Sequence, residues 1–223
     1  MKKPLFFQAL AKFFLGVLLV GLLIFFPAGT LTYPQGWLFM GILFIPMFLA
    51  GLVMMARNPA LLKRRLEAKE KRAEQDRIVK LSGLMFLAGF IAAGLSFRLD
   101  WYVLPWSVSL GAAVVFLLGY SLYAEVLREN TWLSRTIEVQ ENQTVVDTGL
   151  YGLVRHPMYS ATLLLFLSMP LVLGSLVSFL IFLAYPALIT TRLKHEEALL
   201  EEELAGYQEY KKTVKYRLIP FIW

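Results

Sequence analysis

The sequence contains no cysteine and has few charged residues for its length. Only 17% of its 223 residues are charged and 58% are hydrophobic, whereas a typical soluble domain has about 25% charged and about 45–50% apolar residues. Because cysteine is absent, a disulfide, a thiolate nucleophile and a cysteine-based metal site are excluded. The shortage of charge, combined with apolar runs long enough to cross a bilayer, predicts an integral membrane protein.

Two familiar site patterns are also missing. No G-x-G-x-x-G motif follows a predicted strand, so a Rossmann-type nucleotide site is not expected. The histidines, His156 and His195, have no acidic residue at the spacing of a zinc motif, so no metal site is expected. The net charge of +6 lies mostly in loops between apolar runs, where anionic lipid headgroups account for it. We therefore expect contacts with membrane lipids and none with nucleic acid.

Long apolar segments predict transmembrane helices at residues 10–28, 36–56, 81–97 and 102–127. The basic stretch 57–80 separates the second span from the third and predicts a helix on the cytoplasmic membrane surface. Lysine and arginine concentrate at the N-terminus and in this stretch. The positive-inside rule therefore places the N-terminus, the basic stretch and the C-terminus on the cytoplasmic side.

The second half of the chain has a different pattern of apolar and polar residues. Residues 158–189 contain no charged side chain, and this run is too long for one helix crossing about 30 Å but barely long enough for two. Pro170 and Gly174 fall near its middle and predict a tight reversal, hence a short helical hairpin. Alternating apolar residues predict a short extended hairpin within 128–147. Residues 194–216 carry an apolar stripe and predict an amphipathic helix on the membrane surface.

Two polar clusters flank the uncharged hairpin. The first, residues 149–159, reads G-L-Y-G-L-V-R-H-P-M-Y, and the second, residues 191–203, reads T-R-L-K-H-E-E-A-L-L-E-E-E. The hairpin would return both clusters to one membrane face. Pro157 predicts the start of a helix whose first amides favour an anionic group such as a carboxylate, with His156 at the membrane interface outside the core. The alternative interpretation is that Arg155 and His156 only mark the end of a span, where basic residues are common.

Arg192 and Glu196 are four residues apart and so share one helical face. An arginine at the end of a span can bind a carboxylate through both arms of its fork, and a nearby glutamate can balance a cationic ligand. The plainer interpretation is a surface ion pair worth about 0.5 kcal/mol or less. The residues alone leave both interpretations open.

Together with the tail, the clusters form a more specific pattern. It reads T-G-x-Y-x-x-V-R-H-P-M-Y, an apolar hairpin, R-x-x-x-E-E-x-x-L, then G-Y-x-x-Y and R-L-I-P. This pattern resembles the catalytic part of the isoprenylcysteine carboxyl methyltransferase family, especially its prokaryotic branch, over residues 129–223. Leu150 stands where many members have proline, and Ala161 stands where a glycine often follows the R-H-P-x-Y motif.

The resemblance implies a methyltransferase that depends on S-adenosylmethionine and transfers a methyl group to a lipophilic small molecule or lipidated substrate from the bilayer. It implies an all-α integral membrane protein: a bundle of about four spans plus a short helical hairpin, with a cytoplasmic cofactor pocket capped by an amphipathic C-terminal helix. Residues 1–100 would form the N-terminal spans with the basic loop 57–80. Residues 101–223 would form the catalytic membrane region.

The resemblance also implies roles for individual residues. The adenosine end of the cofactor would contact Gln143, Thr144, Val145 and Val146, and its amino-acid end would contact Tyr151, His156, Pro157, Met158 and Tyr159. Glu196 would bind the cofactor and Arg192 would orient the acceptor, which makes these two the catalytic candidates.

The acceptor decides the chemistry. A carboxylate acceptor is already a nucleophile at neutral pH, so positioning, which can supply roughly 7–11 kcal/mol, would replace a general base. The amine of a phospholipid headgroup would instead need a base, for which Glu196 or Glu197 is the candidate. A sterol-reductase-like enzyme with a nicotinamide cofactor is a third interpretation. A transporter or scaffold is a fourth, although no charged residue lies in the middle of a predicted span, where coupling residues usually sit.

Overall fold

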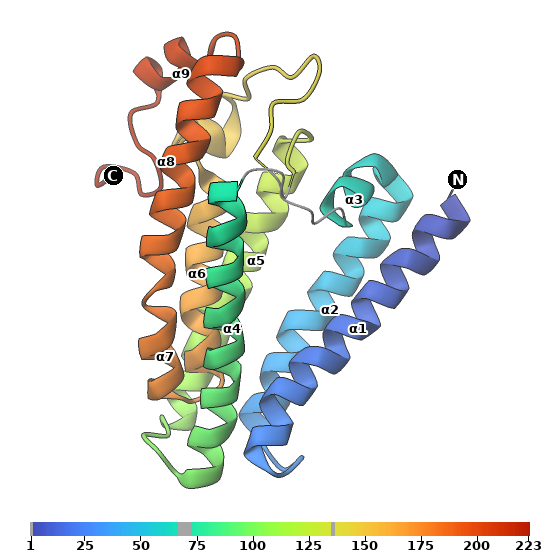
Figure 1. Ribbon diagram of the computed structural model, residues 1–223, viewed down its shortest axis with the longest axis vertical. Helices are drawn as coiled ribbons and strands as arrows, with labels where there is room; N and C mark the ends of the chain where they lie inside the picture. The colour runs from blue at the N-terminus through green and yellow to red at the C-terminus, as the bar shows by residue number, and fades with distance from the viewer. Residues whose placement is uncertain (1, 67–72, 135–136) are drawn as a thin grey trace.

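The computed structural model describes residues 2–66, 73–134 and 137–223 and shows a bundle of helices aligned with the long axis of the molecule (Figure 1). Its described elements are α1 (Lys2–Ala28), α2 (Pro34–Arg57), α3 (Pro59–Leu66), α4 (Ala73–Leu99), α5 (Trp106–Glu129), η1 (Gly149–Gly152), α6 (Pro157–Val172), α7 (Leu176–Phe182), α8 (Tyr185–Glu203) and α9 (Tyr207–Thr213). The predicted all-α membrane fold is confirmed, since the described residues contain no strand beyond an isolated bridge between Val103 and Ser175.

Five segments of the described chain are long and apolar enough to span a membrane. They are Pro4–Ala28, Pro34–Arg57, Gln75–Leu99, Trp106–Glu129 and Leu176–Glu203, and the shorter α6 is apolar as well. The first three predicted spans lie inside α1, α2 and α4. The fourth corresponds to α5, which begins only at Trp106 because Pro105 before it has an extended backbone. The protein is therefore a multi-pass membrane protein.

The predicted hairpin consists of α6 and the pair α7–α8. Gly174 makes the reversal with a φ of +70°, a conformation that glycine adopts without a steric penalty. Ser175 then caps α7, because its side chain accepts a hydrogen bond from the Ser178 amide. Inside the bundle, the Ser175 hydroxyl donates to Ser96 at 2.8 Å and the Ser178 hydroxyl donates to the Gly89 carbonyl at 2.8 Å. These bonds tie α7 to α4 through buried serine side chains.

The prediction of one amphipathic helix over residues 194–216 is wrong. Helix α8 continues without a break to Glu203 and ends there because Leu204 has an extended backbone, and α9 begins after Gly206, which has a φ of +86°. The apolar stripe nevertheless has a structural basis, because its residues meet across the break in a second, smaller core. That core contains Leu204, Tyr207, Tyr210 and Val214, with Val139, Val145 and Leu200 packed against it.

The extended hairpin predicted within 128–147 is also wrong for the residues that the structure describes. A turn occurs at Glu141 and Asn142, as predicted, but no strand flanks it. The reason is that side chains take the backbone bonds that a strand partner would take. The Gln140 amide donates to the Gln143 side chain at 2.9 Å, and the Thr131 carbonyl accepts from Arg64 at 2.7 Å.

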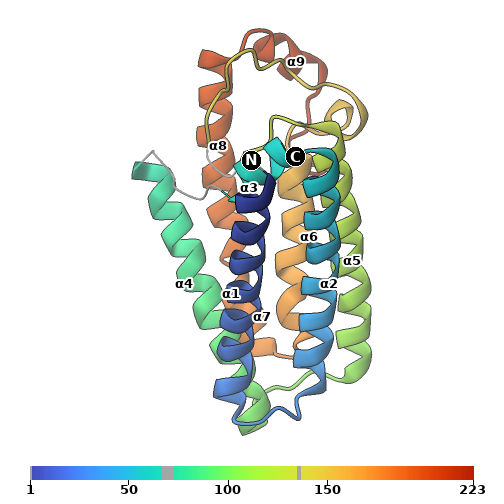
Figure 2. The same cartoon turned by 90° about the vertical axis from the view of Figure 1, so that its right-hand side faces the viewer.

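The basic stretch 57–80 forms more than one element. It contains the end of α2, the short α3 and the start of α4, and its residues 67–72 lie outside the described residues. The N-terminus, α3, α9 and the C-terminus all lie at the upper end of the bundle in Figure 1, and the turned view in Figure 2 agrees. The connections α1–α2, α4–α5 and α6–α7 lie at the opposite end. The predicted common side of the two termini and the basic stretch is thus present in the fold.

We predict that this shared end faces the cytoplasm, as the distribution of lysine and arginine requires. Because the chain has no native cysteine, single cysteines at Arg57, Asp100 and Gln208, all exposed positions, can be labelled with a membrane-impermeant maleimide on intact cells. Only position 100 should react. Labelling of position 208 from outside would contradict this orientation.

A second prediction concerns the crossing of α1 and α4. A Cβ atom on Gly94 would lie 3.0 Å from the Ala28 nitrogen and closer still to the Ile24 carbonyl oxygen, whereas a Cβ atom on Gly83 would meet nothing within 4 Å. Gly94→Ala should therefore push the two helices apart and lower the unfolding free energy by about 1–3 kcal/mol. Gly83→Ala, on the same helix, should be neutral or slightly stabilising. Thermal unfolding in detergent checks both, and equal stability of the two variants would contradict this packing.

Candidate active site

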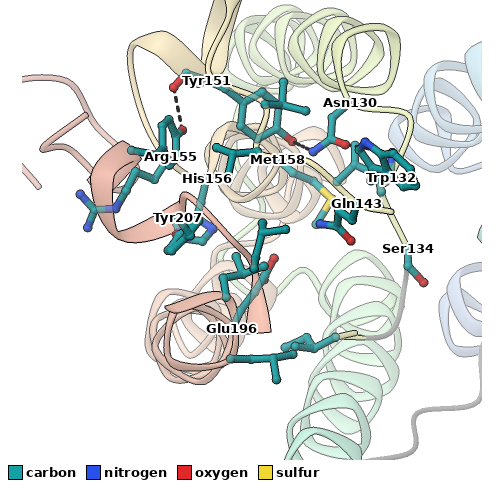
Figure 3. A pocket seen from close by; sticks show the side chains of 18 of the residues that line it. Asn130, Trp132, Ser134, Gln143, Tyr151, Arg155, His156, Met158, Glu196 and Tyr207 are labelled. Atoms are coloured by element: carbon teal, nitrogen blue, oxygen red, sulfur yellow. Dashed lines mark hydrogen bonds between the residues drawn. The ribbon is translucent and has the colours of Figure 1, made fainter. Parts of the chain in front are cut away.

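A pocket opens at the end of the bundle that carries both termini (Figure 3). Its walls come from the loop after α5, the start of α6, one face of α8, and α9. The residues predicted from the sequence converge here from segments far apart in the chain. Those that line the pocket are Gln143, Thr144, Val145, Val146, Tyr151, His156, Met158, Tyr159, Arg192 and Glu196.

Pro157 is the exception among the predicted residues. It is fully buried as the first residue of α6 and does not line the pocket. Its place at the first helical position agrees with its fixed φ and missing N–H group. Pro157 therefore acts on the pocket by starting the helix that carries Met158 and Tyr159.

Tyr159 joins the two catalytic candidates. Its hydroxyl donates a hydrogen bond to Glu196 Oε2 and accepts one from Arg192 Nε at 3.3 Å. Tyr159 itself is 4% exposed, so its ring is fixed by packing. Arg192 and Glu196 on α8 are thus connected through a side chain of α6, inside the pocket and not on an open helix surface.

The neighbouring Glu197 has a different environment. This residue is 3% exposed and does not line the pocket. Its Oε1 accepts from Arg155 Nε at 2.7 Å, and its Oε2 accepts from Arg217 Nε at 2.8 Å. His156 Nε2 lies 3.3 Å from Oε1. A buried carboxylate needs such partners, because an unpaired charge away from water is very costly.

The same arginine fastens the C-terminal segment over the site. Arg155 Nη1 donates to the carbonyls of Val214 and Lys215, each at 2.8 Å. The backbone makes a similar connection, since the amides of Arg155 and His156 donate to the carbonyls of Tyr216 and Arg217, each at 2.9 Å. The Glu197 cluster, defined as Glu197 with Arg155, His156 and Arg217, therefore holds α6, α8 and the tail together.

Two expectations need correction. His156 was expected at the interface outside the core, but its side chain is 5% exposed and lies against Glu197. The start of α6 was expected to offer a set of free amides to an anion. The Tyr159 and Ser160 amides instead donate to the His156 carbonyl at 3.0 and 3.3 Å, and Pro157 has no N–H group. An anionic group would therefore be bound here mainly by side chains.

Several lining residues, including Asn130, Trp132 and Tyr210, were not predicted from the sequence. Two of them bond to Tyr151, which was predicted. Tyr151 is held at both ends: its hydroxyl accepts from Asn130 Nδ2 at 3.0 Å, and its carbonyl accepts from the Tyr210 hydroxyl at 2.7 Å. These two bonds are the dashed lines in Figure 3. Trp132 lines the pocket next to Asn130, and nothing in the sequence singled it out. For Tyr210, the apolar stripe was a usable signal, but it was assigned to the membrane surface.

Tyr207 has an unsatisfied polar group in this pocket. Its hydroxyl is buried and has no hydrogen-bond partner among the described residues, although the side chain lines the pocket. Burial raises the pKa of the Tyr151, Tyr207 and Tyr210 hydroxyls well above their usual value. All three therefore stay neutral near pH 7, and Tyr207 keeps a hydrogen to donate to a ligand.

Fold and pocket together define a class: a multi-pass helical membrane protein with a polar, aromatic-lined pocket at one end. Within that class, residues 106–205 match the family described as phospholipid methyltransferase. The fold matches the structure of the eukaryotic intramembrane Ras methyltransferase ICMT, isoprenylcysteine carboxyl methyltransferase. That match has a TM-score of 0.59 and 18% identity, and it covers 98% of this chain and 85% of the other. The predicted resemblance is confirmed by the shared fold and by the match over 106–205.

A curated relative links the chain to a different activity. The Delta(14)-sterol reductase TM7SF2 of Mus musculus is 33% identical over 91 residues, which are 40% of this chain and 22% of the reductase. The chain therefore spans less than a quarter of that relative's length. A common stretch of this size is compatible with different reactions, so the pocket's own chemistry has to distinguish them.

The Glu197 cluster leads to a prediction about stability. Glu197→Gln would leave the charges of Arg155 and Arg217 without their carboxylate, and it should lower the unfolding free energy by about 3 kcal/mol or more. Glu202→Gln, an exposed position on the same helix, should have little effect. Melting of ligand-free protein in detergent measures both. Similar melting temperatures for the two variants would mean that the cluster does not hold the fold.

Proposed function

We propose that this protein is a membrane methyltransferase that uses S-adenosylmethionine to methylate the carboxylate of a lipophilic acceptor from the bilayer. The observation that carries the proposal is the convergence, in one pocket, of the predicted cofactor residues with Arg192 and Glu196. The match of residues 106–205 to the phospholipid methyltransferase family and the fold shared with ICMT support the same reaction class.

The pocket's side chains fit S-adenosylmethionine, a sulfonium cation that carries a carboxylate. Aromatic faces and a carboxylate favour a cation, and the lining offers Trp132, Tyr151, Tyr159 and Tyr207 together with Glu196. The Tyr207 hydroxyl, which has no partner among the described residues, could donate a hydrogen bond to the cofactor. When bound, this cofactor supplies an electrophilic methyl group.

We assign the two ends of the cofactor to residues from different walls of the pocket. Gln143, Thr144, Val145 and Val146 come from the loop wall and would hold the adenosine end. Tyr151, His156, Met158 and Tyr159 come from η1 and the start of α6 and would hold the amino-acid end. Glu196 would offset the positive charge of the cofactor.

Arg192 is the residue that would hold the acceptor. A guanidinium binds a carboxylate through two parallel hydrogen bonds and so fixes its direction. Arg192 Nε donates a hydrogen bond to the Tyr159 hydroxyl. This bond orients the guanidinium before an acceptor binds. Because a carboxylate needs no deprotonation at neutral pH, orientation and removal of water are the main tasks of the protein.

A second candidate is methylation of a phospholipid amine, which the description of the matched family favours. An amine acceptor must lose a proton, so a base has to lie in the pocket. Of the two glutamates considered for this role, Glu196 lines the pocket and Glu197 does not. Glu197 is therefore not placed to act as the base, and Glu196 is the candidate for that role.

The reductase interpretation fits the pocket less well. A nicotinamide dinucleotide phosphate carries several phosphate groups, which proteins usually bind with arginine or lysine. Among the residues that the structure describes, two arginines line the pocket, Arg155 and Arg192, alongside the carboxylates of Glu138 and Glu196. Arg155 is already bonded to Glu197 and to two backbone carbonyls. Among the described residues, the lining therefore has no excess of positive charge, which does not favour such a cofactor.

The roles of Arg192 and Glu196 can be separated in one set of purified variants. Glu196→Gln should weaken S-adenosylmethionine binding by about 1.5–3 kcal/mol, the worth of a hydrogen bond to a charged group. Arg192→Ala should bind the cofactor almost normally and transfer no methyl group. Arg192→Lys should also transfer poorly, because a point charge cannot align a planar carboxylate. Cofactor titration and single-turnover transfer are measured on each variant.

Two acceptors distinguish the two candidate reactions: a prenylated cysteine analogue with a free carboxylate, and vesicles of phosphatidylethanolamine. Transfer to the carboxylate that depends on Arg192 supports the proposal. Transfer to the amine with full activity of Arg192→Lys would favour the phospholipid reaction. Equal loss of cofactor binding in the Arg192 and Glu196 variants would reduce both residues to a structural pair.

A further inference from the structure

The basic helix α3 contacts the wall of the pocket. Arg64 Nη1 donates to the Gln140 side-chain oxygen at 2.9 Å, and Arg64 Nη2 donates to the Thr131 carbonyl at 2.7 Å. Thr131 lies at the start of the loop that follows α5, residues 130–148, and Gln140 lies near its middle. One guanidinium of the N-terminal region therefore bridges two points of a loop in the C-terminal region.

The bonds of Arg64 extend to residues that face the pocket. The Gln140 side-chain amide donates to the Trp132 carbonyl, and the Gln140 backbone amide donates to the Gln143 side chain at 2.9 Å. Trp132 and Gln143 both line the pocket, whereas Gln140 and Arg64 do not. Arg64 is thus one residue removed from two groups of the pocket wall.

Helix α3 is itself fixed to the bundle. Leu61 and Leu62 are buried at 3% and 5% exposure, and Lys12 of α1 donates to the carbonyl of Leu66 at 2.6 Å. The Arg65 guanidinium lies 5.5 Å from the centre of the Tyr123 ring on α5, which is the range of a cation–π contact. Arg64 therefore projects from a fixed support onto a loop whose described residues have no regular secondary structure.

We propose that Arg64 is a positioning residue that holds the described parts of the pocket wall, residues 131–134 and 137–143, in their binding geometry and so sets the affinity for the cofactor. The planar fork of arginine suits this task, because it can reach a carbonyl and an amide oxygen at once. A loop with few backbone bonds of its own opens easily unless another element restrains it. The proposal rests on the proposed function for the identity of the cofactor, but the restraint itself does not.

This assignment changes the interpretation of the basic stretch. Positive charge next to membrane spans is usually explained by lipid headgroups. Both terminal nitrogens of Arg64 already have protein acceptors, so its role here is internal. Arg57, an exposed arginine at the end of α2, is the matched control because it carries the same charge in the same stretch.

The test measures hydrogen exchange and cofactor binding on Arg64→Ala, Arg64→Lys and Arg57→Ala in detergent. In ligand-free protein, Arg64→Ala should speed amide exchange within 137–145, while Arg57→Ala should match the wild type. The dissociation constant for S-adenosylmethionine should rise about tenfold in Arg64→Ala, as expected for loss of bonds to a charged group. Single-turnover transfer at saturating cofactor should change less than about twofold, because Arg64 does not touch the reactants.

Each outcome has a meaning. Unchanged exchange, or faster exchange with unchanged affinity, would overturn the proposal. Wild-type protein that fails to bind S-adenosylmethionine would overturn the proposed function, and faster exchange in Arg64→Ala would still support the restraint. If Arg64→Ala does not fold, Gln140→Leu removes the same bond from the loop side and carries the test with the same readouts.

Discussion

The site depends on one buried carboxylate. Glu197 lies inside the protein at 3% exposure and bonds to Arg155 and Arg217, so α8 cannot shift without leaving charges unpaired. Because Arg155 also binds the backbone of the tail, the same group closes α9 and the C-terminal segment against the bundle. Glu196, the preceding residue on α8, lines the pocket. Adjacent glutamates thus divide into one that holds the fold and one that faces the pocket.

The pocket is assembled from parts that could not form it separately. The start of α6 supplies Tyr159, α8 supplies Arg192 and Glu196, and the loop after α5 supplies a wall that Arg64 restrains from α3. The helical hairpin brings the first two parts together because Gly174 permits its reversal far from the site. A methyl acceptor from the bilayer would meet side chains whose directions are already set, which is what a reaction governed by positioning requires.

Much of this could be predicted from the sequence, because membrane spans are long and the two polar clusters are dense. The spans, the hairpin at Gly174 and the meeting of Arg192 and Glu196 with the R-H-P-M-Y segment all follow from hydropathy and spacing. The loop wall could not be predicted in the same way. Its conformation depends on Arg64, which is distant in sequence, and its bonds are made by side chains that leave no periodic signal. The structural role of Glu197 could not be predicted, because it depends on tertiary contacts with Arg155 and Arg217.

The most direct test of the account is ligand stabilisation of the detergent-purified protein. Thermal unfolding is followed during separate titrations with S-adenosylmethionine, S-adenosylhomocysteine and NADPH. The account predicts that the first two ligands raise the melting temperature, with about 2.7 kcal/mol of stabilisation at a hundredfold excess over the dissociation constant, and that NADPH does not. Stabilisation by NADPH alone would contradict it.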